Sequence, residues 1–131
     1  MHRILRDSQS AEHVCTAGLF HSVYGTSSFS TVTIERGRRE EVRELIGGWA
    51  EDLTWTFCNL SRPRLFEVSL AQQKFDWLEA LSIRRNKQHF WQDLARMECA
   101  NLLEQKTLYQ FPLLLRHAQD IGMLDEEGFS V

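Results

Sequence analysis

The sequence predicts an all-α fold, and three of its features support this prediction. Only Pro63 and Pro112 interrupt the 131 residues, so long helices meet few breaks. Apolar residues recur at helical spacing in most segments, and only residues 26–34 are rich in Ser, Thr and β-branched side chains. The length suits one domain, and no internal repeat divides it. We therefore expect a single-domain helical bundle.

Capping serines and a glycine predict where the N-terminal helices begin and end. Residues 1–7 look like the end of a helix. Ser8 or Ser10 can cap the next helix, since a serine oxygen accepts from the unpaired amides of a first helical turn, and Gly25 ends it. Residues 26–34 predict a loop with one short extended segment. The helices expected in the whole chain cover about residues 1–7, 10–24, 37–46, 48–60, 71–85, 88–105 and 108–120.

The two central helices differ in character. Residues 37–46 alternate arginines and glutamates, and we expect this mixed-charge helix to lie in solvent. Gly47 and Gly48 interrupt it before the helix over 48–60. That helix has one apolar face, from which Glu51 and Asp52 are expected to point away; the face consists of Trp49, Leu53, Phe57 and Leu60.

The C-terminal half contains the most helical segment of the chain. Residues 64–70 fit either an extended segment or a short helix, and residues 71–85 direct Phe75, Leu78 and Leu81 inward. Residues 88–105 follow, and Pro112 lies near enough to the start of the last helix to be tolerated. We expect the helical domain to cover residues 1–121 and an acidic tail to cover 122–131.

Composition excludes several functions. Fifteen basic against eighteen acidic residues give a formal charge of −3, so a basic nucleic-acid surface is absent. No apolar run approaches the length of a membrane helix, so we expect neither nucleic acid nor a membrane as partner. Three widely spaced cysteines, Cys15, Cys58 and Cys99, are typical of reduced thiols in a cytoplasmic protein. The N-terminus has no long apolar stretch, so we expect no signal peptide.

The most distinctive segment is residues 17–26, AGLFHSVYGT, which places His21 at the end of an apolar helix before a loop. This run resembles the His-Asp segment of the HD superfamily of helical, metal-dependent phosphohydrolases. Residues 46–53 and 99–105 resemble later motifs of the branch that hydrolyses guanosine tetraphosphate alarmones. AGLFHSVYGT itself is similar to an uncharacterised HD-like family of unknown function. The resemblance covers roughly residues 3–105.

This chain departs from the metal ligands that the resemblance implies. His21 matches the histidine of the pair, but Ser22 and Asn101 stand where the superfamily has aspartates. Neutral oxygens are poor ligands for hard cations, so we expect no metal and no other cofactor. His13 and His89 are too far along their own helices to assist at this site.

The residues expected at the site are His21 and Glu98, as acid or base, with ligand-binding Ser22, Tyr24, Thr26 and Asn101. On an apolar helix, Glu98 points either to the pocket or to solvent.

Three functions remain open at this stage. The first is a degenerate, metal-free HD-like domain that binds a small molecule or a protein. The second is an enzyme that uses His21 or Glu98 without a metal, and the third is a metal-dependent phosphohydrolase or oxygenase. A first core helix that is short or missing would leave an apolar groove, so we also expect self-association as a homodimer.

Overall fold

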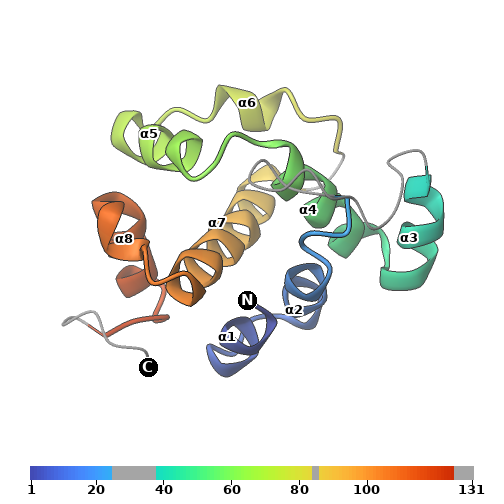
Figure 1. Cartoon of the computed structure of the whole chain (residues 1–131). Coiled ribbons are helices and arrows are strands. Elements are labelled where there is room, and N and C mark those ends of the chain that lie inside the picture. The colour runs from blue at the N-terminus through green and yellow to red at the C-terminus, as the bar shows by residue number, and fades with distance from the viewer. Residues whose placement is uncertain (25–37, 84–85, 126–131) are drawn as a thin grey trace.

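A computed structural model of the chain describes residues 1–24, 38–83 and 86–125. Within these ranges the secondary structure is helical and contains no strand (Figure 1). The prediction of an all-α, single-domain fold is therefore confirmed. None of the described helices is long and apolar enough to cross a membrane.

The N-terminal helices form two closely joined pairs. Helices α1 (His2–Asp7) and α2 (Glu12–Leu19) pack so tightly that a Cβ atom on Gly18 would lie 2.4 Å from Leu5 Cδ1. Helices α3 (Arg39–Ile46) and α4 (Gly48–Asn59) meet at Gly47, whose φ of +90° is a conformation that other residues rarely adopt. This sharp joint turns α3 back against α4, and that contact builds the cleft described below.

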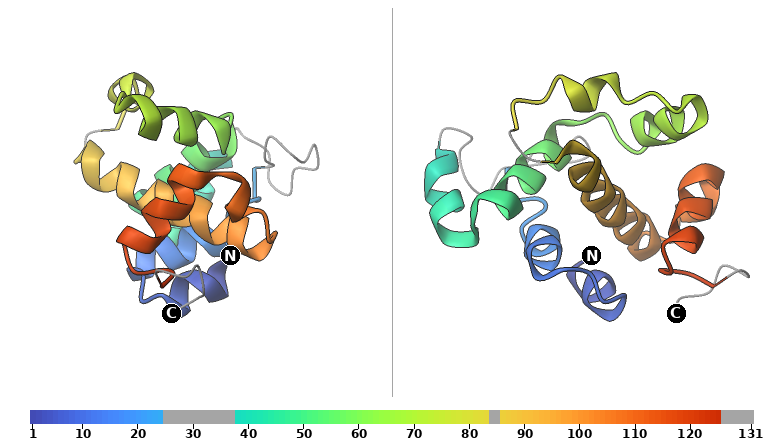
Figure 2. Two further views of the ribbon diagram at one scale, coloured as in Figure 1. Left: turned by 90° about the vertical axis from the view of Figure 1, so that its left-hand side faces the viewer. Right: turned by 180° about the vertical axis from the view of Figure 1, so that it is seen from behind.

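The 18-residue α7 (Lys87–Glu104) organises the rest of the molecule. It contacts α1, α2, α4 and α6 (Asp76–Glu79), as well as the 3-10 helix η2 (Leu108–Gln110) and α8 (Pro112–Asp120). Helix α5 (Arg64–Gln72) packs mainly on α8 (Figures 1 and 2), and its Phe66 ring also packs edge-on against Trp91 of α7, with ring centroids 5.1 Å apart. Because α7 has neighbours on most sides, eleven of its residues are buried.

Three boundaries differ from the sequence expectation. Helix α2 ends at Leu19, and residues 20–24 are turns. Residues 64–70 are helical, whereas the helix expected over 71–85 is wrong. Helix α5 stops at Gln72 because Gln73 adopts a left-handed conformation with φ +53°, and the short α6 follows.

The core extends further along the chain than expected. Met123 and Leu124 are 3% exposed and belong to the main core, although we expected the helical domain to end at residue 121. The extended segment expected within 26–34 and the last six residues lie outside the described part.

Candidate functional site

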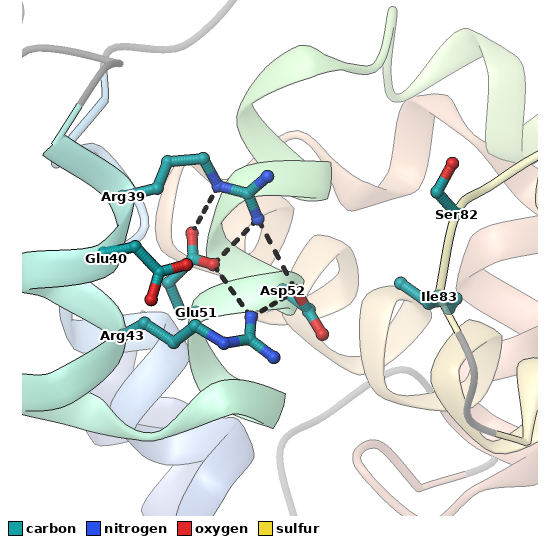
Figure 3. A pocket seen from close by; sticks show the side chains of 7 residues that line it. All are labelled: Arg39, Glu40, Arg43, Glu51, Asp52, Ser82 and Ile83. Carbon is teal, nitrogen blue, oxygen red and sulfur yellow. Dashed lines mark hydrogen bonds and ion pairs between the residues drawn. The ribbon is translucent and has the colours of Figure 1, made fainter.

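A polar cleft of about 380 Å³ opens between α3, the first turn of α4 and the segment after α6 (Figure 3). An adjoining hollow of similar size continues beside Trp55 and Thr56 on α4. The first cleft is lined by Arg39, Glu40, Arg43, Glu51, Asp52, Ser82 and Ile83. Charged groups from two helices therefore dominate it.

Two arginines of α3 reach two carboxylates of α4. Arg39 and Arg43 are four residues apart and so lie on one face of α3. The Arg39 guanidinium binds Glu51 with two hydrogen bonds, of 2.9 and 2.7 Å. Arg43 Nη1 donates to Asp52 Oδ1 at 2.8 Å and lies 3.3 Å from Glu51 Oε1. Such paired, charge-assisted bonds fix both guanidiniums in place.

The network is anchored in the protein interior. Glu51 is fully buried, and the hydroxyl of the equally buried Tyr24 donates to its Oε2 at 2.9 Å. Burial raises the pKa of Tyr24, and the bond to Glu51 raises it further, so this hydroxyl keeps its proton. The Arg39 guanidinium also lies 4.3 Å from the centre of the Trp55 ring. Arg39 is thus held by a carboxylate and by an aromatic face.

Each arginine keeps donors for a ligand. Among the described residues, no partner contacts Arg39 Nη1 or the Nε and Nη2 atoms of Arg43. In Figure 3 the second terminal nitrogen of each guanidinium points away from the carboxylates. Both side chains are 34% exposed, so these donors are accessible. Three carboxylates and two guanidiniums line the cleft, which leaves a small excess of negative charge.

Glu98 and Asn101 lie together on α7, as expected, but in a closed setting. The Glu98 side chain is 0% exposed, which settles its direction toward the interior, and Arg62 Nη1 binds it at 3.1 Å. Asn101 Nδ2 donates to Glu98 Oε1 at 3.1 Å. The Arg62 guanidinium in turn lies 3.6 Å from the centre of the Phe57 ring. Glu98 thus has no surface that a diffusing substrate could touch.

Among the described residues, those expected around His21 do not form one hydrogen-bonded group, although the His21 ring lies edge-on to Phe57, which also contacts Arg62. His21 follows α2 in a turn, where its Nδ1 binds the Gly18 carbonyl at 2.8 Å, and Ser22 is exposed. Tyr24 binds Glu51 instead of joining Glu98. Thr26 lies outside the described residues. Among the residues described, no hydrogen bond links Tyr24 and Glu51 to Glu98 and Asn101.

The superfamily's metal arrangement does not fit these residues. The side-chain amide group of Asn101 donates to Glu98, and its Oδ1 accepts a hydrogen bond from Gln105 Nε2 at 3.2 Å. Neither Ser22 nor Asn101 brings a carboxylate to the position beside His21. His21 therefore lacks the carboxylate partners with which the superfamily holds a divalent cation.

Sequence reasoning missed the cleft for a specific reason. The helix of residues 39–46 was expected to be solvated, but Arg39 and Arg43 are half-buried against α4. Glu51 was expected to point away from the buried face, yet α4 is buried on several sides. The four-residue spacing of the arginines was visible in the sequence, but their partners on the next helix were not.

One family model matches the chain. Residues 1–62 match a domain of unknown function, DUF6817. The matched part contains α1 to α4, and hence His21 and the charged residues of the cleft, whereas the lining residues Ser82 and Ile83 lie beyond it. No curated protein and no solved structure matches the chain.

Proposed function

We propose that the chain is a non-catalytic, HD-like module that binds a small polar molecule in the Arg39–Arg43 cleft. One observation carries this proposal: two guanidiniums are fixed by the buried Glu51 and the partly buried Asp52, while their remaining donors face an open cleft of about 380 Å³. Donors that are already fixed lose little conformational freedom when a ligand arrives. The volume lies in the range of small-molecule sites.

The charges of the cleft define the ligand class. An arginine donor edge suits a carboxylate or another single anionic group. The additional carboxylate, Glu40, attracts a cationic group and repels a ligand with several negative charges. A small zwitterion, such as an amino acid, matches both features. A nucleotide polyphosphate, the substrate class that the HD resemblance implies, does not.

A binding role also agrees with the closed setting of Glu98 and the carbonyl-bound ring of His21. The alternatives, a hydrolase or an oxygenase, would need a reactive group that a substrate reaches. A protein partner and a homodimer stay predictions, as does the cytoplasmic location, with which three buried free cysteines agree.

Thermal unfolding in the presence of ligands tests the proposal. The panel consists of the free amino acids, with pyrophosphate and guanosine diphosphate as anionic probes. We expect at least one amino acid to raise the Tm by several degrees at saturation, because a ligand that binds only the folded state stabilises it. Arg43→Gln removes cleft donors and should abolish the shift. Arg116→Gln, which changes an exposed arginine of α8, should keep it.

Two results would count against this function. If no amino acid shifts the Tm, or if the shift persists in Arg43→Gln, the cleft is not the binding site. If guanosine diphosphate gives the larger shift, the ligand class is wrong and a phosphohydrolase becomes the better hypothesis.

A further inference from the structure

Two histidines that the sequence analysis set aside, together with an aspartate that it did not consider, meet on the face formed by α2 and α7. His13 lies on α2, while His89 and Asp93 lie one turn apart on α7. His13 Nε2 is 2.9 Å and His89 Nε2 is 3.7 Å from the same atom, Asp93 Oδ2. The three candidate ligand atoms all lie within 4.8 Å of one another. They share no residue with the Arg39–Arg43 cleft.

The spacing of these atoms fits a small tetrahedral ion. Zinc binds nitrogen and carboxylate oxygen at about 2.0–2.2 Å, which places tetrahedral ligands about 3.3 Å apart. The two distances to Asp93 Oδ2 bracket that value. The third separation, between the two imidazole nitrogens, is at most 4.8 Å, so the two histidine side chains would move about an ångström toward each other to bind the ion.

The surroundings orient the carboxylate and frame both imidazoles. Trp49 Nε1 donates to Asp93 Oδ2 at 2.7 Å. The Trp49 ring also lies edge-on to His13 and to His89, with centroid distances of 5.4 Å in each case. A hydrogen bond from a neighbouring group to a ligating carboxylate is typical of metal sites, where it fixes the orientation of the ligand.

Exposure decides what kind of site this is. The Asp93 side chain is 8% exposed, whereas those of His13 and His89 are 36% and 53% exposed. A buried carboxylate with two accessible imidazoles leaves one side open to water. Two nitrogens and one oxygen suit zinc, whereas magnesium and calcium prefer oxygen ligands alone.

We propose that His13, His89 and Asp93 bind one zinc ion, with solvent in the fourth position. The alternative is a purely structural network, in which Asp93 accepts hydrogen bonds from Trp49 and the two imidazoles. Both arrangements make Asp93 important for stability. Only the first makes the protein respond to zinc.

Calorimetric titration of the tag-free, chelator-treated protein with zinc chloride separates the two. We expect one zinc per chain. His13→Gln and His89→Gln should each weaken binding by at least about tenfold, since each removes one of three ligands. His2→Gln, which changes a histidine of α1 outside the cluster, should leave the affinity unchanged. Circular dichroism checks that each variant is folded.

Tryptophan fluorescence gives a second readout that does not depend on function. Copper(II), which takes the same ligand types, should quench Trp49 through its contact with both imidazoles. Trp49→Phe should remove most of that quenching. If the wild type binds no zinc, or binds it as tightly after His13→Gln and His89→Gln, the network is structural and the proposal is overturned.

Discussion

Glu98 and Arg62 form an ion pair that is almost completely withdrawn from solvent, with side chains 0% and 5% exposed. Asn101 adds a hydrogen bond to the carboxylate, and the Phe57 ring covers the guanidinium. Removing both charges of such a pair together costs little, but removing one leaves the other buried and uncompensated. The pair therefore makes a sharp prediction about stability.

Glu98→Ala should lower the free energy of unfolding by about 3–5 kcal/mol, because Arg62 loses its counter-charge in the interior. Urea unfolding followed by tryptophan fluorescence measures this loss. The exposed Glu44→Ala should change stability by less than about 0.5 kcal/mol. The double variant Arg62→Met/Glu98→Leu should recover most of the loss. A cost below about 1 kcal/mol for Glu98→Ala would mean that the pair is solvated.

At the scale of single residues, the sequence predicts which helix face a side chain occupies better than it predicts which residue that side chain contacts. The apolar helix indicates that Asn101 faces the core and leaves the direction of Glu98 open, and both residues are buried. His89 and Asp93 stand four residues apart, a spacing that itself indicates one helix face. Their neighbour His13 lies 80 residues from Asp93 in the chain, and only the packing of α2 on α7 brings it there.

At the scale of elements, a carboxylate from another helix caps the N-terminus of α8. Glu67 of α5 accepts from the backbone amides of Leu113 and Leu114 at 2.7 and 2.9 Å. No side chain adjacent to α8 in the chain caps it, since Phe111 and Pro112 offer no acceptor. The negative charge of Glu67 also interacts favourably with the positive end of the α8 dipole. Glu67 thus joins α5 to α8.

Glu67→Ala should destabilise the protein by about 1–2 kcal/mol, the loss typical of a removed helix cap. Glu67→Gln keeps an acceptor oxygen but no charge, so it should cost less. Raising the salt concentration should reduce the difference between wild type and Glu67→Gln, because salt screens the dipole interaction. Urea unfolding at low and high salt measures both effects. Equal stabilities of wild type and Glu67→Ala would show that solvent caps α8 equally well.

Periodicity predicts the two longest of the described helices well. The 18-residue α7 and the 12-residue α4 lie within a residue of their expected bounds. The helix expected over 71–85 fails because local geometry overrides spacing. Gln73 turns left-handed, Lys74 N binds the Ser69 carbonyl, and Trp77 Nε1 binds Ser69 Oγ at 2.9 Å. These interactions turn the chain after Gln72, where a continuous helix would keep its direction.

For the whole molecule, the main core surrounds α7 and a smaller cluster lies around Tyr24 and Val42, and composition and periodicity predict this class of fold. They do not predict which charged groups the core encloses. Each buried carboxylate depends on a partner from another segment of the chain: Glu51 on Arg39, Glu98 on Arg62 and Asp93 on His13. Such pairing is tertiary information, and for this reason the sequence indicated a different site around His21.

The pH dependence of global stability should reveal one further buried group. His117 of α8 lies beside Trp91, and its buried Nε2 atom has no hydrogen-bond partner among the described residues. Burial lowers the pKa of His117 below its usual 6.5, so the folded chain binds its proton less well than the unfolded chain does. The His117 contribution to stability is therefore full above pH 6.5 and is lost as pH falls toward the lowered pKa.

His117→Leu removes this titration, so its stability relative to wild type should rise as pH falls from about 7.5 to about 5.5. Urea unfolding of both proteins at the two pH values measures the change. Thr107→Val is the matched control, because it also removes a buried oxygen that lacks a partner among the described residues, yet introduces no change in titration. Its stability relative to wild type should be the same at both pH values. A constant difference for His117→Leu would mean that His117 takes up its proton equally well in the folded chain, and that the fold opens to water beside Trp91.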